Sequence, residues 1–488
     1  MMPEPVTPML EREAGSTRKQ KIRALFDGLA GERDKWLARN AFFHEDDRNY
    51  MRFLIPEGLR VLELGCGTGS VLHALHPSRG VGVDFSGPAI DLARSEHPDL
   101  EFVVGDIEDP ATLEKLGGPF DVIVLSDTVG YLEDCQALLA SLHTLCVPET
   151  RLVISYYSPL WEPVLWLAER FGAKMPQPPL NWITSDDFSG LLDLAGFEVI
   201  KREWRQLLPK RFFGLGRLVN RFLGTLPVFR RLSLRTYIVA RAQRRRVSAQ
   251  LSATVLVPCR NERGNIENAV LRTPRFCEDL EILFVEGNST DGTFEECERV
   301  KAAYPDFKIR VLRQDGKGKG DAVRKGFAEA GGDVLMILDA DLTMPPESLP
   351  KFYEAIASGQ GEFINGTRMV YPLEKDSMRF LNYWANRVFS WLFSWLLNQR
   401  FTDTLCGTKV LRRDAYARIA ANRAYFGDFD PFGDFDLIFG AAKLNLKIVE
   451  VPVRYASRSY GTTQISRFRH GWLLLQMVVF AYRKLKAF

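Results

Sequence analysis

The stretch VLELGCGTGS, residues 61–70, passes from an apolar run into a glycine-rich turn and on toward a helix. Gly65, Gly67 and Gly69 allow tight backbone geometry and let a ligand come close to the start of that helix. Asp84 stands nineteen residues after Gly65, at the end of the next apolar run, where its carboxylate can accept both hydroxyls of a ribose. The stretch therefore predicts a strand, a turn and a helix of an α/β domain with a nucleoside-type ligand.

Short β-branched runs alternate with helical stretches along the 488 residues, which predicts two parallel sheets with helices on both faces. The strands expected in the first sheet are 60–64, 80–84, 101–105, 121–125, 152–156, 197–201 and 236–240. Those expected in the second sheet are 253–258, 281–286, 308–312, 333–339, 362–365 and 447–453. A polar, basic stretch separates the two sets, so we expect an N-terminal extension over 1–40 and domains over 41–247 and 248–488.

The motif E/D-x-G-x-G-x-G stands here as Glu63-Leu64-Gly65-Cys66-Gly67-Thr68-Gly69, with Asp84 after it and Asp106-Ile107 after the third apolar run. In this combination it resembles the class I S-adenosylmethionine-dependent methyltransferases, over roughly residues 40–245. The resemblance implies a Rossmann-like sheet of seven strands and S-adenosylmethionine as cofactor. Glu63 and the glycine turn would face the methionine part of the cofactor, Asp84 its ribose, and Asp106 and Ile107 its adenine. An NAD-like or inactive fold is the alternative.

The methyl acceptor and its base are left open by the sequence. A hydroxyl acceptor would need in-line placement and a base to remove its proton. The side chains that could lie near the opening of the site are Asp127, Tyr131, His143 and Tyr156. Spacing selects none of them.

A second polar motif, LDADLTM at 338–344, ends an apolar run with Asp339 and Asp341 on either side of one alanine. Two such carboxylates repel each other unless a cation or water separates them, and their hard oxygens suit Mg²⁺ or Mn²⁺ with a substrate diphosphate. A single D-x-D is weak. Three further segments precede it: the strand ends at 257–262 and 285–293, and the glycine- and lysine-rich loop at 315–322. Four such segments in this order predict a nucleoside-diphosphate cleft.

This order of motifs looks like the family 2 inverting glycosyltransferases of GT-A fold, over about 250–470, and most like the branch that makes polyprenyl-phosphate sugars. The stretches 401–416, 426–455 and 458–472 support it. The resemblance implies metal ligation by Asp339 and Asp341. The residues it implies for nucleotide-sugar binding are Pro258, Asn261, Glu262, Glu286, Asp291, Lys319, Asp339 and Arg458. The sequence departs from the family at 286–293, at Thr343 and at 461–464, which leaves open the nucleobase preference, the metal geometry and the sugar or acceptor, respectively.

The acceptor determines which further residues the glycosyl transfer needs. The metal on Asp341 would stabilise the nucleoside diphosphate that leaves. A lipid phosphate is already an anion, so it needs cations to hold it, and Arg368 and Arg379 are the candidates. A hydroxyl acceptor would instead need a base, for which Asp434 or Asp436 is the choice.

Positive charge is concentrated in two stretches, although the net charge is only +3. Residues 201–246 hold fourteen Lys and Arg against one acid, and 451–488 hold seven and no acid. Large apolar residues lie among them, which favours an anionic membrane surface over nucleic acid, with a solvated basic face as the alternative. A helix expected over 379–398 has polar residues every four positions; we interpret it as lying in the membrane interface, with packing inside the domain as the alternative. No segment reaches the roughly 20 apolar residues of a membrane span.

Two further features indicate the compartment. The N-terminus lacks the apolar stretch of a signal peptide, and the seven cysteines show no C-x-x-C spacing, which favours a reducing compartment. We therefore expect a cytoplasmic, peripheral enzyme.

The expected function combines methyl transfer with transfer of a hexose from a UDP- or GDP-sugar to a polyprenyl-phosphate-type or glycolipid acceptor. One alternative is glycosyl transfer to a saccharide or glycolipid hydroxyl, with the methyltransferase fold serving only to sense S-adenosylmethionine or dock to a membrane. Another is a soluble polysaccharide or protein acceptor.

Overall fold

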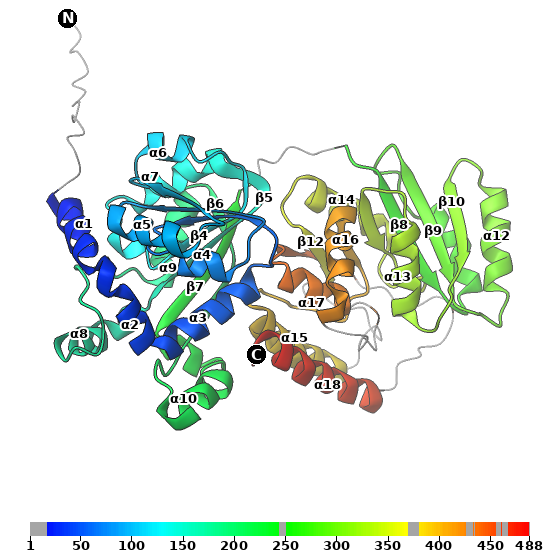
Figure 1. The fold of residues 1–488 in the computed structure, drawn as a ribbon. Coiled ribbons are helices and arrows are strands. Elements are labelled where there is room, and N and C mark those ends of the chain that lie inside the picture. Colours follow the sequence, from blue (N-terminus) through cyan, green and yellow to red (C-terminus); the bar gives the residue numbers. More distant parts are fainter. Residues whose placement is uncertain are drawn as a thin grey trace, which may run out of the picture. The chain divides into compact units, whose positions relative to one another are not determined.

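The computed structural model describes residues 17–243, 250–368, 380–425, 433, 435–454, 460 and 467–487 (Figure 1). The chain forms two compact units, Met1–Gln243 and Arg244–Phe488, and each is described here by itself. Each unit contains one seven-stranded sheet with helices packed on its faces, which confirms the expected α/β class.

The sheet of the first unit contains all seven strands that the sequence predicts. They are β1 (Arg60–Leu64), β2 (Arg79–Asp84), β3 (Glu101–Val104), β4 (Phe120–Ser126), β5 (Cys146–Tyr157), β6 (Phe197–Arg205) and β7 (Arg235–Ala242). Their spatial order is β3-β2-β1-β4-β5-β7-β6. The sheet is mixed, not parallel as expected, because β7 runs antiparallel to both β5 and β6. Arg205 and Arg235 are partners in the β6–β7 ladder, so residues 206–234 leave and re-enter the sheet at the same end and need no crossover.

Helices cover both faces of this sheet, as the alternation of side chains along β1 requires. The helices are α1 (Thr17–Leu29), α2 (Arg33–Arg39), α3 (Ala41–Leu54), α4 (Ser70–Ala74), α5 (Gly87–Glu96), α6 (Pro110–Glu114), α7 (Cys135–Ser141), α8 (Glu162–Arg170), α9 (Ser185–Leu194) and α10 (Leu215–Leu218). Leu62 and Leu64 belong to a core shared with α6, α7 and α9. Val61 belongs to the core on the other face, shared with α3, α4 and α5.

The second sheet contains one strand that the sequence analysis missed. Its strands are β8 (Ala253–Cys259), β9 (Leu280–Glu286), β10 (Lys308–Arg313), β11 (Val334–Ile337), β12 (Phe363–Thr367), β13 (Lys409–Arg412) and β14 (Ile448–Pro452), in the order β10-β9-β8-β11-β13-β12-β14. The missed strand is β13, which runs antiparallel to β11 and β12 and makes this sheet mixed too. Its four residues, KVLR, are too few to show a strand period.

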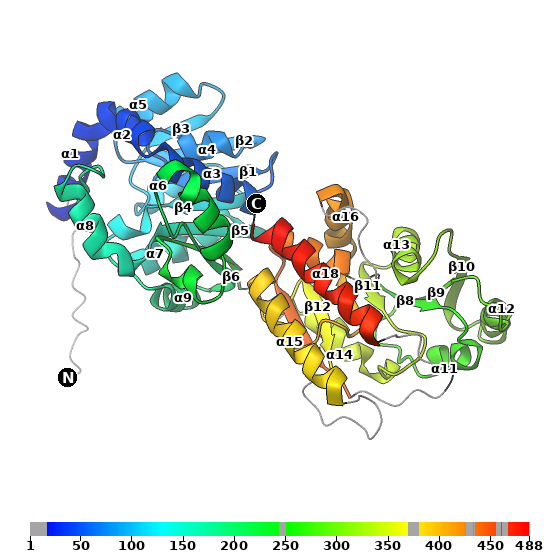
Figure 2. The ribbon, with the colours of Figure 1, turned by 90° about the horizontal axis from the view of Figure 1, so that it is seen from below.

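The helices of the second unit are α11 (Ile266–Leu271), α12 (Thr293–Ala303), α13 (Lys319–Glu329), α14 (Leu349–Ala357), α15 (Phe380–Leu397), α16 (Arg413–Ala421), α17 (Phe435–Lys443) and α18 (Arg467–Leu485). Of these, α15 and α18 lie side by side (Figure 2). The rings of Trp395 and Tyr482 are 5.7 Å apart where the two helices meet.

Two polar positions of α15 face the protein. Asn386 and Ser390 are buried and donate hydrogen bonds to Asp403 Oδ1 at 3.1 Å and to the Thr402 carbonyl oxygen at 2.8 Å. The exposed side of the helix carries Val388 and Trp391 instead. Asn386 and Ser390 therefore contribute to packing inside the domain, and the membrane-interface interpretation of this helix stays a prediction. Among the described helices none is long and apolar enough to span a bilayer.

Candidate active sites

The glycine turn of the first unit lies at the carboxyl end of β1 and adopts a backbone that other residues rarely take. Gly65, Gly67 and Gly69 have φ angles of +76°, +53° and +76°. A Cβ on Gly65 would lie 2.4 Å from Thr128 Oγ1, so a side chain at this position would collide with the segment that follows β4. Gly65 and Gly67 line a pocket at this edge of the sheet, and Gly69 lies outside its lining.

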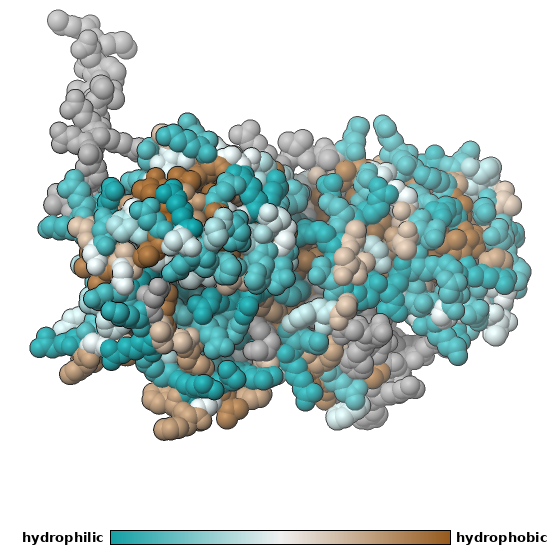
Figure 3. All heavy atoms as spheres, viewed as in Figure 1, coloured by the Kyte–Doolittle hydropathy of each residue, from teal (hydrophilic) through white to brown (hydrophobic). Residues whose placement is uncertain are grey.

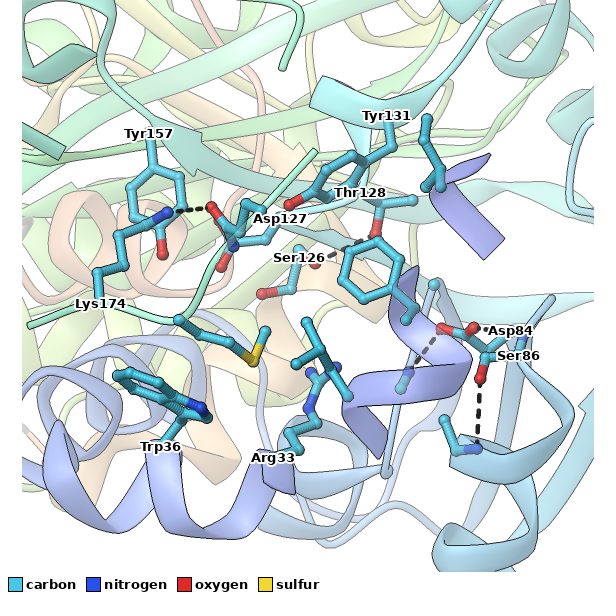
Figure 4. A pocket seen from close by; sticks show the side chains of 18 of the residues that line it. Arg33, Trp36, Asp84, Ser86, Ser126, Asp127, Thr128, Tyr131, Tyr157 and Lys174 are labelled. Carbon is cyan, nitrogen blue, oxygen red and sulfur yellow. Dashed lines mark hydrogen bonds between the residues drawn. The ribbon is translucent and has the colours of Figure 1, made fainter. Parts of the chain in front are cut away.

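Asp84 connects the turn to the neighbouring strand. Its Oδ2 accepts a hydrogen bond from Gly67 N at 2.8 Å, and its Oδ1 accepts one from Ser86 N at 2.9 Å (Figure 4). Burial raises the pKa of Asp84, and these two backbone donors oppose that rise. The carboxylate lines the pocket where the sequence predicts a ribose acid.

Glu63 differs from the expectation that it faces the cofactor. Its side chain is buried, and Oε2 accepts a hydrogen bond at 3.0 Å from Leu72 N, in the first turn of α4. Burial raises the pKa of Glu63 to about 8. Glu63 is not among the residues that line the pocket. Its carboxyl group instead accepts a hydrogen bond from an amide at the start of α4 that has no partner within the helix.

The N-terminal helices form a wall of this pocket, a role that the sequence analysis did not assign to residues 1–40. Asp106 and Ile107 line the pocket as expected, and Lys19 of α1 forms ion pairs with Asp106 and Glu108, both at 2.7 Å. Other lining residues from α1 and α2 are Ile22, Phe26, Leu29, Arg33, Trp36 and Leu37. No motif marks this segment in the sequence, so only packing reveals its position.

Arg33 is the most informative residue of that wall. Figure 4 shows it in the pocket wall on α2, and its Nη1 would lie 2.6 Å from a Cβ built on Gly67. Its charge lowers the pKa values of both Glu63 and Asp84 against the effect of their burial. Within the described part of the chain its guanidinium has no hydrogen bond or ion pair, so its donors are available to an anion in the pocket.

A buried charge network lies at the other end of the pocket. Arg235 is inaccessible to solvent and lies between Asp47, at 3.0 Å, and Asp127, which it contacts closely; Ser155 Oγ accepts a further hydrogen bond at 2.9 Å. Asp127 has a φ of +57° and follows β4. Burial raises the pKa of Asp127, and the Arg235 guanidinium opposes this.

The structure reduces the four candidates for the acceptor side to two. Asp127 and Tyr131 line the pocket. Tyr156 belongs to the hydrophobic core, and His143 Nε2 lies 2.7 Å from the Ala195 carbonyl oxygen. His44, which the sequence analysis missed, also lines the pocket, and burial lowers its pKa to about 4, so its imidazole is neutral near pH 7.

In the second unit, Asp339 follows β11 and meets the lysine of the glycine-rich loop. Lys319 Nζ lies 2.7 Å from Asp339 Oδ1. Burial raises the pKa of Asp339, but the cations of Lys319, Lys409 and Arg368 together outweigh burial, so the pKa lies below its ordinary value. A Cβ on Gly407 would lie 1.7 Å from Asp339 Oδ2, so the loop before β13 fits against this carboxylate only with glycine.

Asp341 is oriented by the residue that departs from the family pattern. Its Oδ1 accepts hydrogen bonds from Thr343 N at 3.1 Å and from Thr343 Oγ1 at 2.8 Å. The described residues contain no group of three or more His, Cys, Asp or Glu side chains that could hold a metal. Mg²⁺ is commonly bound by only one or two carboxylates together with substrate phosphates and water.

The predicted nucleotide-binding residues come together on two adjacent loops. Asn261 N donates to Ser289 Oγ at 2.9 Å, and Arg263 N donates to Asp291 Oδ2 at 3.2 Å. These contacts link the loop after β8, which holds Asn261 and Glu262, to the loop after β9, which holds Asp291; Pro258 and Glu286 lie at the ends of the two strands. Because β9, β8 and β11 are parallel neighbours, both loops open at the same sheet edge as Asp339.

The residues predicted for the acceptor are placed differently. Arg368 is buried and donates to Asp403 through Nε at 2.6 Å and Nη2 at 2.8 Å, so a carboxylate already compensates the charge expected to hold a lipid phosphate. Asp436 Oδ2 accepts a hydrogen bond from Arg423 Nε at 3.2 Å. Arg379, Asp434 and Arg458 lie outside the described residues.

Comparison with known proteins assigns each unit to a class. A family model described as a methyltransferase domain matches residues 36–202, and one described as glycosyl transferase family 2 matches residues 254–420. The chain carries a methyltransferase domain and a family 2 glycosyltransferase domain. The expected recognition of both halves is thereby confirmed, and both belong to enzyme classes.

Among curated relatives, the glycosyltransferase domain is similar to two proteins named dolichol-phosphate mannosyltransferase. The Pyrococcus furiosus protein is 39% identical over 122 residues, covering 25% of this chain and 34% of the relative. The Saccharomyces cerevisiae protein is 37% identical over 109 residues, covering 21% of this chain and 40% of the relative. The matched stretches thus span well under half of each relative's own length.

Among solved structures, the methyltransferase domain is similar to an S-adenosylmethionine-dependent methyltransferase of Thermotoga maritima, with 17% identity and a TM-score of 0.35. That match covers 45% of this chain and 99% of that one. Magnesium protoporphyrin IX methyltransferase from Synechocystis, with bound S-adenosylmethionine, matches at 17% identity and a TM-score of 0.30, covering 47% of this chain and 100% of that one.

Proposed function

We propose that the chain is a bifunctional enzyme. The first domain transfers a methyl group from S-adenosylmethionine. The second transfers a hexose, with inversion, from a UDP- or GDP-sugar to a polyprenyl-phosphate-type acceptor on a membrane. The domain limits we propose are 41–247 and 248–488, with residues 1–40 contributing to the first site.

The observation that supports methyl transfer is one pocket that gathers the Gly65–Gly67 turn, Asp84, Asp106 and Ile107. Asp84 would accept the ribose hydroxyls, and Ile107 would pack against the adenine. Arg33 would pair with the carboxylate of the methionine part, since its charge has no ion-pair partner among the described residues. When bound, S-adenosylmethionine supplies an electrophilic methyl group.

Binding by the full chain tests this part directly. Titration calorimetry with S-adenosylmethionine and with NAD⁺ is expected to give heat only with the former. Binding of NAD⁺ alone would instead support the dinucleotide alternative. Incorporation of labelled methyl into a lipid extract then separates a methyltransferase from a domain that only senses the cofactor.

The observation that supports sugar transfer is the Lys319–Asp339 ion pair. It lies at the edge of the sheet where β8 and β9 end and the loops after them begin. Lys319 would neutralise diphosphate oxygens, and Asp339 and Asp341 would hold Mg²⁺ or Mn²⁺. When bound, such an ion stabilises the charge that develops on the departing diphosphate. The two dolichol-phosphate mannosyltransferase relatives support a polyprenyl-phosphate acceptor.

A panel of sugar nucleotides tests this second part. Mg²⁺- or Mn²⁺-dependent donor binding or turnover by the full chain is expected for one donor class and is expected to disappear in D339N/D341N. Activity that EDTA leaves unchanged would contradict the proposed metal site. Transfer to a saccharide hydroxyl, with none to a polyprenyl phosphate, would contradict the proposed acceptor.

A further inference from the structure

The pocket of the methyltransferase domain extends beyond the residues proposed to hold the cofactor. From the glycine turn it continues to a compartment with mostly aromatic and aliphatic walls, formed by Trp36, Phe43, Tyr157, Leu165, Met175 and Leu234. Apolar walls of this kind favour an acceptor with a substantial hydrophobic part over a small polar one.

Two segments form the rim of this compartment. One is α8, which contributes Leu165 and Ala168 to the lining, and the other is the insertion 206–234, which contributes Pro209, Lys210 and Leu234. Both lie near α2 in Figure 1. Phe43, Leu165 and Leu234 pack in one small cluster.

The insertion is held in a defined shape against the domain. Asn220 is buried, and its side chain both accepts from Leu208 N at 2.8 Å and donates to the Leu208 carbonyl oxygen at 2.9 Å. Trp161 Nε1, just before α8, donates to the Leu232 carbonyl oxygen at 2.8 Å and so links the two rim segments. The outward side chains of the rim are therefore presented by a folded framework.

The outer side of this rim is strongly apolar. Trp166 and Phe171 beside α8 are 59% and 78% exposed, and Phe212, Leu218 and Val228 of the insertion are 56%, 57% and 75% exposed. Phe213 is fully exposed. Figure 3 shows hydrophobic atoms gathered over the region of α10. An exposed patch of this composition marks a surface that meets a protein or a membrane.

The charges among these residues favour a membrane. Residues 204–235 contain no Asp or Glu. Arg211 and Arg217 are exposed and form no ion pair with any described residue. At the pocket, Lys210 Nζ donates to Asn40 Oδ1 at 2.6 Å and has no carboxylate partner within the described segments. Cations interleaved with aromatic residues match the interface of a bilayer with anionic lipids.

We propose that this rim docks on an anionic membrane and that the methyl acceptor is a membrane-anchored molecule that enters the pocket from the bilayer, with a phosphate group at Lys210. This inference rests on the proposed methyl transfer. It gives a substrate class to a pocket that comparison with relatives leaves without an acceptor. It also explains why apolar residues surround the opening of a site whose cofactor is polar.

Amide hydrogen exchange of the full chain tests the docking surface locally. Vesicles of phosphatidylcholine with phosphatidylglycerol are expected to protect amides in 160–171 and 211–232, and phosphatidylcholine alone is expected to protect them much less. Protection confined to α15 and α18 would overturn the proposal, because the second domain alone would then meet the membrane. Protection of the rim without vesicles at higher protein concentration would also overturn it, by indicating a second copy of the chain as the occupant.

Matched variants separate charge from apolar contact. R211Q/R217Q is expected to lower vesicle partition about 30-fold, because each basic residue near an anionic surface contributes about a fivefold step. F212S/F213S is expected to remove the protection of 211–232. L194S, which alters a side chain that is 70% exposed outside the pocket lining, is the control and should behave as the wild type.

Cofactor binding distinguishes failure of this inference from failure of the proposed function. The rim variants are expected to keep the wild-type Kd for S-adenosylmethionine. If the wild type binds the cofactor but its rim stays unprotected by anionic vesicles, the docking proposal is wrong while the methyltransferase assignment stands. If K210Q leaves methyl transfer to vesicle-borne phospholipid or polyprenyl phosphate unchanged, the phosphate position is wrong.

Discussion

Replacing Arg33 with glutamine tests how the N-terminal wall contributes to cofactor binding. The wild-type guanidinium lies against Gly67 and has no partner among the described residues, so a bound carboxylate would gain a charge-assisted hydrogen bond without breaking another one. Such bonds contribute about 1.5–3 kcal/mol. Because Arg33 is only partly buried, we expect about 2 kcal/mol, which corresponds to a Kd about 30-fold weaker in R33Q.

The choice of ligand makes this experiment specific. Titration calorimetry with S-adenosylmethionine should show the full loss, whereas methylthioadenosine, which has no carboxylate, should bind R33Q and wild type alike. R23Q serves as the control, since Arg23 is an exposed residue of α1 that does not line the pocket. Equal weakening of both ligands would refute the carboxylate contact and would indicate that Arg33 only holds the wall in place.

Three further substitutions test other parts of the structure. K319A removes a cation that keeps the pKa of Asp339 low. As the pH falls, metal-dependent donor binding should therefore disappear at a higher pH in K319A than in the wild type. An unchanged pH profile would show that the ion pair is unimportant for donor binding. E63Q should change the pH dependence of stability: the folded pKa of about 8 lies above the ordinary value of 4.5, so the wild type loses stability as pH rises between these values. In urea unfolding, E63Q should lose less stability than the wild type, by on the order of 4 kcal/mol at pH 8, and parallel pH curves for the two proteins would contradict the buried, neutral carboxyl. G407A should abolish donor binding because its Cβ would meet Asp339 Oδ2, whereas G331A, whose Cβ has room, should bind donor normally; similar binding by both would show that the loop before β13 can move away.

The sequence alone was sufficient to predict the strand–turn–helix segments of both units. The motif from Glu63 to Gly69 and the pair Asp339 and Asp341 are local patterns, and each is placed by the strand that precedes it. Strand direction was not predictable in the same way. The antiparallel β7 has the same composition as a parallel strand, because hydrogen-bond direction depends on where the chain re-enters the sheet.

The direction in which side chains point was the second feature that could not be predicted from the sequence. Glu63 matches an acidic motif position, yet its carboxylate serves the start of α4, and Arg368 is compensated by Asp403, which is thirty-five residues away in sequence. A buried charge pairs with whichever partner the fold places beside it, since leaving it unpaired costs several kcal/mol. Such partners come from distant segments and leave no spacing to detect.

What the sequence determined by itself was therefore the kind of chemistry: glycines that permit left-handed turns, carboxylates at strand ends, and basic residues among aromatic ones in 206–234. These are properties of single residues and their near neighbours. The tertiary structure decided which of them share a site. It placed Arg33 against Gly67, Lys319 against Asp339 and the insertion beside the pocket, because only packing brings groups that are far apart in the chain within reach of one ligand.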